Sequence, residues 1–145
     1  MNRNGPVILI EDDMDDQEIL MDVFKKLQYP NEMICFTDGI KAFDFLDQSE
    51  VIPFIILCDV NLPKLDGFAL RDKIKMDAKL HVKSIPYLLF TTAVSETAAM
   101  QAYSLSVQGI FIKQTKMEEI EKTIALIMEY WKRCISFDHT DEHVT

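Results

Sequence analysis

Six polar residues of this sequence could do chemistry together, because each stands at the end of a short apolar run: Glu11, Asp12, Asp59, Thr91, Thr92 and Lys113. Carboxylates that are packed closely raise one another's pKa and are tolerated mainly with a cation among them. An all-oxygen set of carboxylates, water and a backbone carbonyl suits Mg²⁺ or Mn²⁺. A lysine and a hydroxyl at the rim add donors for an anion. Such a set predicts phosphoryl transfer onto an aspartate, with the carboxylate as the nucleophile.

These residues meet only if the apolar runs are strands of one sheet. Five runs recur, each followed by a polar break and then by helical periodicity: VILI (7–10), MICF (33–36), FIILC (54–58), YLLF (87–90) and IFI (110–112). Strands that are apolar on both faces and alternate with amphipathic helices indicate a parallel sheet covered on both sides. The sequence therefore predicts an α/β fold with a five-stranded, doubly wound parallel sheet. Ligands of such sheets bind beyond the carboxyl ends of the strands.

Length and charge exclude several classes of protein. The chain has 145 residues and a net charge of −9, which fits one globular domain and repels phosphate backbones. No apolar stretch approaches the ~20 residues of a membrane helix, and no signal peptide precedes the first apolar run. Three separated cysteines are typical of core residues in a reducing cytosol: Cys35, Cys58 and Cys134. We expect a cytoplasmic protein that binds neither nucleic acid nor membranes.

Several further polar and aromatic residues are assigned structural roles. Acidic residues favour helix N-termini, so Asp13, Asp15 and Asp16 are interpreted as capping residues and are left out of the predicted metal site. Asp66 and Gly67 are interpreted as a cap and a turn that open a helix. Three aromatic residues of the later helices are interpreted as packing residues, with an interface as the alternative for any that are exposed: Tyr103, Tyr130 and Trp131.

The segment D-V-N-L-P-K-L-D-G, from Asp59 to Gly67, resembles the motif D-x-x-[LM]-P-x-[LM]-[DN]-G of the receiver domain of two-component response regulators. The resemblance covers the chain from about Val7 to Trp131. It implies a flavodoxin-like, CheY-like (βα)5 fold with strand order 2-1-3-4-5, of the stand-alone single-domain type.

The resemblance also implies a role for each site residue. Asp59 is the expected phosphoacceptor, and Lys113 is expected to contact the phosphoryl group. Asp12 is expected to ligate Mg²⁺ directly, Glu11 mostly through water, and Asn61 through its backbone carbonyl. Mn²⁺ is an alternative ion at the same ligands.

The hydroxyl that contacts the phosphoryl group can come from either of two threonines. Thr91 lies five residues after Pro86 and 22 before Lys113, which matches the family's spacing. Thr92 would then take the small-residue position that gates access to the phosphoryl group. We therefore predict Thr91 for this role, with Thr92 as the alternative.

Two positions depart from the family's pattern. The lysine is normally followed by a proline in a cis peptide, whereas Gln114 follows it here, and a cis bond without proline costs several kcal/mol. We therefore expect a trans peptide and a different aim for Lys113. The aromatic switch residue three positions before the lysine is replaced by Ile110, and the neighbouring Phe111 should face the other side of the sheet.

The sequence predicts a receiver domain over residues 1–135, followed by a short polar tail at 136–145 and by no output domain. Such a protein is a phosphorylation-controlled switch of the bacterial cytoplasm rather than an enzyme. A histidine kinase or a histidine phosphotransfer protein would supply the phosphoryl group. A downstream protein, or a second copy in a homodimer, would bind the surface of the last two helices and the last strand.

Two other functions compete with this one. A phosphatase of the haloacid-dehalogenase type also uses an aspartate after a parallel strand with Mg²⁺, but it needs a second acid where this sequence has Asn61. A pseudo-receiver would keep the fold as a binding module without being phosphorylated. Only Gln114 and Ile110 favour the pseudo-receiver.

Overall fold

The computed structural model describes residues 1–136 and contains a five-stranded parallel sheet, as the sequence predicts. The strands are β1 (Val7–Ile10), β2 (Met33–Phe36), β3 (Ile55–Asp59), β4 (Tyr87–Thr91) and β5 (Gly109–Ile112). Their order is β2-β1-β3-β4-β5, which confirms the predicted order. Of the predicted tail, Ser136 is buried, and residues 137–145 lie outside the described part of the chain.

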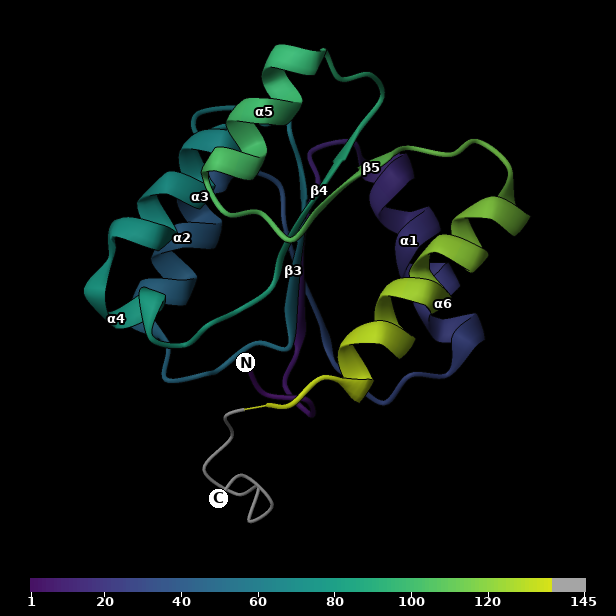
Figure 1. Cartoon of the computed structure of the whole chain (residues 1–145). Coiled ribbons are helices and arrows are strands. Elements are labelled where there is room, and N and C mark those ends of the chain that lie inside the picture. Colours follow the sequence, from purple (N-terminus) through teal and green to yellow (C-terminus); the bar gives the residue numbers. More distant parts are fainter. Residues whose placement is uncertain (137–145) are drawn as a thin grey trace.

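Helices cover both faces of the sheet (Figure 1). They are α1 (Met14–Leu27), α2 (Gly39–Gln48), α3 (Gly67–Met76), α4 (Ala78–His81), α5 (Glu96–Ser104) and α6 (Met117–Arg133). Helices α1 and α6 lie on one face, and α2 to α5 lie on the other (Figure 1). Within the described residues no helix combines the length and the apolar character that crossing a membrane requires.

Helix α4 was not predicted from the sequence. It has four residues, which is too short for an apolar period to show. The Asp77 side chain begins it by accepting a hydrogen bond from the Leu80 backbone at 2.9 Å, and Leu80 itself is buried. The predicted helix between the third and fourth strands is therefore two helices.

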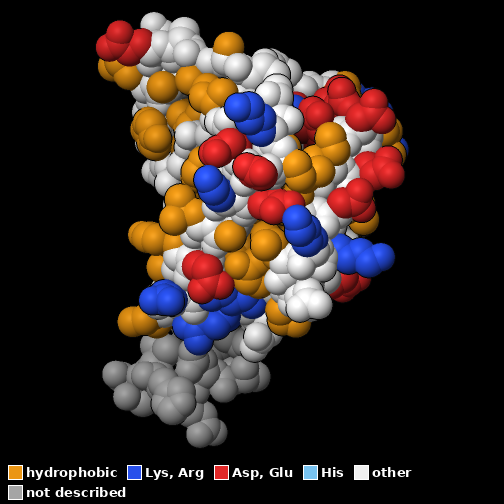
Figure 2. Space-filling model, turned by 90° about the vertical axis from the view of Figure 1, so that its right-hand side faces the viewer, with side chains coloured by type: hydrophobic (Ala, Val, Ile, Leu, Met, Phe, Trp, Pro, Cys, Tyr) orange, Lys and Arg blue, Asp and Glu red, His pale blue; other side chains and the backbone are white. Residues whose placement is uncertain are grey.

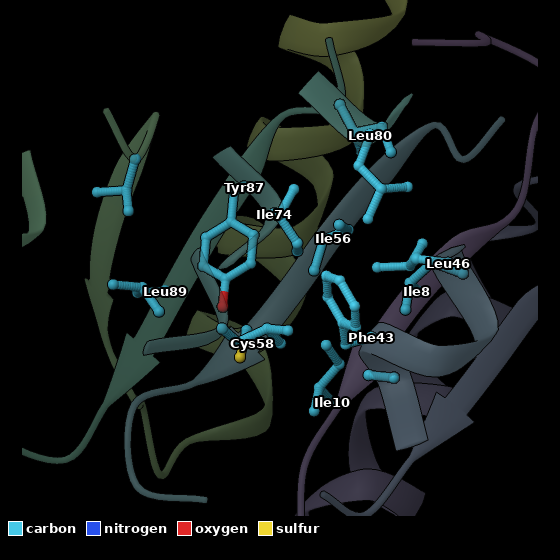
Figure 3. Packing of buried hydrophobic residues seen from close by; sticks show 14 of the residues in the cluster. Ile8, Ile10, Phe43, Leu46, Ile56, Cys58, Ile74, Leu80, Tyr87 and Leu89 are labelled. Carbon is cyan, nitrogen blue, oxygen red and sulfur yellow. The ribbon is translucent and has the colours of Figure 1, made fainter. Parts of the chain in front are cut away.

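The sheet separates two apolar cores. Successive strand residues point to opposite faces, so Ile8 and Ile10 pack under α2 and α3, while Val7 and Leu9 pack under α1 and α6. Figure 3 shows the first of these cores, where Phe43 and Leu46 of α2 face the strand residues. Because β1, β3 and most of β4 are fully buried, the polar residues at their ends are held on a rigid support.

Acidic caps fix the helices that flank the carboxyl ends of the strands. The Asp13 carboxylate accepts hydrogen bonds from the backbone of Asp15 at 2.9 Å and of Asp16 at 3.1 Å, which begins α1. The Asp66 carboxylate accepts one from the Ala69 backbone at 2.8 Å, which begins α3. Capping is thus confirmed for Asp13 and Asp66.

The aromatic residues near β5 follow the sequence prediction in part. Phe111 stacks on Phe90 with ring centroids 5.4 Å apart on the α1–α6 side, whereas Ile110 packs into the opposite core. Tyr103 and Tyr130 are 56% and 61% exposed, which matches the alternative of surface residues, although the Tyr130 ring also lies edge-on to Trp131 with centroids 5.1 Å apart. Both stand on helix faces turned away from the sheet. Trp131 does pack against the α1–α6 core.

Candidate functional site

Three carboxylates meet where β1 and β3 end. The two strands are paired in register, so Glu11 and Asp59 come to the same edge of the sheet. Ligand atoms of Glu11, Asp12 and Asp59 all lie within 4.8 Å of one another. Glu11 and Asp59 are buried, whereas Asp12 is exposed. Within the described residues this is the one cluster of acidic, histidine and cysteine side chains close enough to hold a metal ion together.

Lys113 brings a positive charge to this cluster from the end of β5. Its Nζ atom lies 2.8 Å from Asp59 Oδ2, 2.9 Å from Glu11 Oε2 and 3.1 Å from Asp16 Oδ2. Its backbone N–H donates to the Thr91 carbonyl at 2.8 Å, which ties it to β4. The described peptide bonds, including the one before Gln114, are trans as expected, and the lysine nonetheless reaches Asp59.

Asp16 was missed as a site residue by the sequence analysis. The residue lies in the first turn of α1, where acids are favoured by the helix terminus alone. It also pairs with Lys113, and its side chain is 42% exposed. An acid at a helix start and an acid in an ion pair give the same sequence signal, so the sequence does not indicate the second role of Asp16.

The cluster contains more negative than positive charge. Burial raises the pKa of Glu11 to about 7, with the nearby Asp59 carboxylate acting in the same direction and the hydrogen bond from Lys113 opposing both. Burial alone would lower the pKa of the Lys113 ammonium, but its bonds to Asp59, Glu11 and Asp16 outweigh this and raise it. One lysine therefore does not compensate the buried carboxylates fully.

Backbone groups orient the carboxylates. The Asn61 N–H donates to Asp59 Oδ1 at 3.0 Å, so that each oxygen of Asp59 has its own donor. The Asp13 N–H donates to Glu11 Oε1 at 3.1 Å, and the Gln17 side chain donates to the Glu11 carbonyl at 3.3 Å. Asn61 is exposed, and it contacts the site through its backbone rather than its side chain.

The two candidate threonines differ in environment. Thr91 is buried at the end of β4, and its hydroxyl donates to the Ala93 carbonyl at 2.8 Å. Thr92 is exposed. Asp59 of β3 is paired with Phe90 of β4, and Thr91 of β4 is paired with Ile112 of β5. Thr91, the residue after Phe90, therefore lies next to the end of β3.

A cavity of about 280 Å³ opens beside the lysine, between α1 and α6. Most of its lining is apolar and includes Ile19, Leu20, Ile120 and Ile124. Glu11, Asp16 and Lys113 also line it. On the face formed by these helices, acidic side chains gather at the upper right, while basic side chains are spread over the middle and the lower end (Figure 2).

The donor set fits a hard divalent cation. Carboxylates and a backbone carbonyl are the ligands that Mg²⁺ and Mn²⁺ prefer, and burial together with the nearby Asp59 carboxylate raises the pKa of Glu11, which a cation at this position would oppose. The arrangement thus combines a candidate cation site, the buried Asp59 carboxylate and a lysine that can pair with an anion.

Known proteins are similar to this chain in sequence and in fold. The family model for the response regulator receiver domain matches residues 7–125. Rcp1, a response regulator of Synechocystis, is 30% identical over 135 residues, covering 90% of each chain. A probable methanogenesis regulatory protein of Methanothrix harundinacea, FilR2, is 31% identical over 129 residues, covering 86% of this chain and 82% of its own.

Solved structures agree with the sequence matches. The phosphorylated cyanobacterial phytochrome response regulator RcpA superposes with a TM-score of 0.79 at 28% identity, covering 92% of this chain and 96% of its own. The Mn²⁺-bound form of Rcp1 gives a TM-score of 0.76 at 31% identity, covering 90% and 97%.

Proposed function

Because the chain belongs to the response regulator receiver domain family, we propose that it is a Mg²⁺-dependent switch whose Asp59 accepts a phosphoryl group. The observation that carries the proposal is the position of the Asp59 carboxylate. One of its oxygens lies 2.8 Å from Lys113 Nζ, and the residue shares a candidate cation site with Glu11 and Asp12. The phosphorylated RcpA and the Mn²⁺-bound Rcp1 support the same chemistry by similarity.

The site residues divide the chemistry among them. Glu11, Asp12, Asp59 and the Asn61 carbonyl would hold the ion, which supplies positive charge to the oxygens of the transferred group. A carboxylate oxygen of Asp59 forms the bond to phosphorus, while the bond from phosphorus to the donor's leaving group breaks. The leaving group takes the electron pair: acetate leaves as the anion, and the imidazole of a histidine donor takes up a proton from water. Lys113 is then placed to pair with the added negative charge.

Thr91 is the proposed switch hydroxyl. Its hydroxyl donates to the Ala93 carbonyl, two residues away. A rotation of the side chain exchanges this contact for one with a phosphoryl oxygen. The loop after β4 would follow that rotation, which biases α5 and β5 between two packings. Thr92, being exposed, fits the gating position better than the switch position.

A histidine kinase or a histidine phosphotransfer protein is the proposed donor, and a protein or a second copy is the proposed receiver of the signal. Exposed apolar side chains support an interface along α5, β5 and α6: Met100, Tyr103, Ile112, Leu126 and Tyr130. No turnover of a separate substrate is proposed, because Asn61 stands where a dehalogenase-type phosphatase needs an acid.

Intact mass after incubation with acetyl phosphate tests the proposal. We expect one phosphoryl adduct on the wild type with Mg²⁺, and none with EDTA or in Asp59→Asn. Lys113→Met should still bind the ion but gain the adduct on the order of 10- to 100-fold more slowly. A wild type that binds Mg²⁺ yet stays unmodified would favour a phosphorylation-independent binding module instead.

A further inference from the structure

A buried tyrosine lies behind the acceptor site. Tyr87, the first residue of β4, is fully buried, and its hydroxyl donates to the Gly67 carbonyl at 2.7 Å. Figure 3 shows this hydroxyl pointing toward the side chain of Cys58, the residue before Asp59. A tyrosine within an apolar core is placed by the partner of its hydroxyl, since a buried hydroxyl without one is costly.

Gly67 closes the loop that follows Asp59. Its N–H donates to the Val60 carbonyl at 2.9 Å. A Cβ atom at Gly67 would lie 2.7 Å from the Asp59 carbonyl oxygen, so the start of α3 is in direct contact with the acceptor's backbone. The Cys58 thiol donates to the same Asp59 carbonyl at 3.2 Å. Through Gly67, the Tyr87 hydroxyl thus holds both ends of the loop at 60–66.

The other side of Tyr87 is bound to the turn between α5 and β5. Its N–H donates to Gln108 Oε1 at 2.6 Å, and its carbonyl accepts from the Gln108 N–H at 3.0 Å. The Arg71 guanidinium lies 5.6 Å above the Tyr87 ring. From there it donates to the carbonyls of Leu105 and Ser106, each at 3.0 Å.

We propose that Tyr87 is a positioning residue for Asp59, and that Tyr87 and Arg71 together couple the acceptor loop to the turn at 105–108. The proposal rests on the function proposed above for Asp59. When a phosphoryl group adds charge to Asp59 and the loop at 60–66 shifts, one of two things must happen. Either Tyr87 moves with the loop, or its hydroxyl loses the hydrogen bond to the Gly67 carbonyl. A buried hydroxyl without a partner is costly, so Tyr87 moves with the loop. Its movement then displaces Arg71 and the turn at 105–108.

The coupling explains how this chain can work without an aromatic residue at position 110. Ile110 lies in the same core as Tyr87 and has no polar group to exchange partners. The Tyr87–Arg71 contacts join the same two regions, the acceptor loop and the α5–β5 segment, through α3 instead of through the end of β5.

Tyr87→Phe tests the positioning role, because it removes the hydroxyl and keeps the ring. We expect the rate constant for phosphorylation at saturating acetyl phosphate to fall roughly five- to tenfold, the factor for one lost buried hydrogen bond. The Kd for Mg²⁺ and the concentration of donor at half-maximal rate should change little. Ile74→Val is the matched control, since Ile74 lies in the same core and has no polar atom in its side chain. Equal rates in both variants would overturn the positioning role.

The coupling is tested by a cycle that needs no phosphorylation. Asp59→Asn removes the acceptor's charge, and its effect on the NMR amide shifts of 105–108 is compared in three backgrounds. We expect the amides of 106 and 107, whose peptide carbonyls Arg71 binds, to respond in the wild-type and Ile74→Val backgrounds and to stop responding with Arg71→Met, whereas Gln108 keeps its own bonds to Tyr87. A response that is unchanged by Arg71→Met would overturn the coupling. An unmodified wild type in the mass experiment would instead contradict the function of Asp59, and the cycle still decides the coupling.

Discussion

At the scale of single residues, the site is governed by carboxylates that one lysine does not fully neutralise. Burial raises the pKa of Glu11 from its ordinary 4.5 to about 7, so the native state holds this proton more tightly than the unfolded state does. The stabilisation from this proton is complete below pH 4.5 and is lost as the pH rises through about 7. A cation at the carboxylates competes with the same proton.

We therefore expect the free energy of unfolding in EDTA to fall by on the order of 1–3 kcal/mol as the pH rises through this window, and Mg²⁺ to recover the loss. Over the same window the apparent affinity for Mg²⁺ should increase. Urea unfolding and calorimetric titration on both sides of the window measure the two effects. Glu11→Gln cannot titrate, so a variant with the same pH dependence as the wild type would show that another group is responsible.

Lys113 gives a second prediction at this scale. Its replacement by Met leaves buried Glu11 and Asp59 without their cation, so the metal-free protein should lose about 1–3 kcal/mol of unfolding free energy. Mg²⁺ should restore part of this loss. Lys26→Met is the matched control, because Lys26 is 67% exposed in its pair with Glu121 and should cost less than about 1 kcal/mol. Equal losses in the two variants would mean that Lys113 does not neutralise the cluster.

At the scale of elements, α3 is where packing and chemistry meet. The Cβ atom of Gly67→Ala would approach the Asp59 carbonyl, which is backbone and cannot move aside, so we expect a loss of about 1–3 kcal/mol and slower phosphorylation. The Cβ atom of Gly109→Ala meets only side chains, the Phe111 ring at 3.1 Å and Leu88 Cδ2 at 3.4 Å, which can shift. Urea unfolding and the phosphorylation rate compare the two. A Gly109→Ala variant that is as damaged as Gly67→Ala would show that the backbone contact is not the cause.

The elements also show what the sequence could and could not predict. Strands β1, β3 and β4 are apolar on both faces, and that pattern is typical of the central strands of a parallel sheet. The carboxylate cluster at their ends could be predicted as well, because the carboxyl ends of parallel strands meet at one edge of the sheet. Helix α4 has four residues, about one helical turn, so its apolar residues cannot show a repeat and only its cap, Asp77, could have indicated it. Tyr87 looked like one more apolar strand residue, because the partner of its hydroxyl lies 20 residues away in sequence.

At the scale of the whole molecule, charge and exposed apolar surface oppose each other. A net charge of −9 disfavours association of two copies, and a phosphoryl group adds about two negative charges. Yet Leu126 and Tyr130 on α6 are 66% and 61% exposed, beside the edge strand β5. Such exposed apolar groups favour burial against a partner, and screening by salt weakens the repulsion that opposes it.

If this surface joins two copies, the phosphorylated protein should form a dimer that strengthens with salt, measured by light scattering after size-exclusion chromatography. Leu126→Arg places a charge at the centre of the interface and should keep the protein monomeric. Val82→Arg is the matched control, because Val82 is 74% exposed but follows α4, on the other face of the sheet, and the variant should still dimerise. A dimer that survives Leu126→Arg would place the interface elsewhere. A monomer under all conditions would leave the α5–β5–α6 surface for a different protein, since its apolar side chains would still lack a partner.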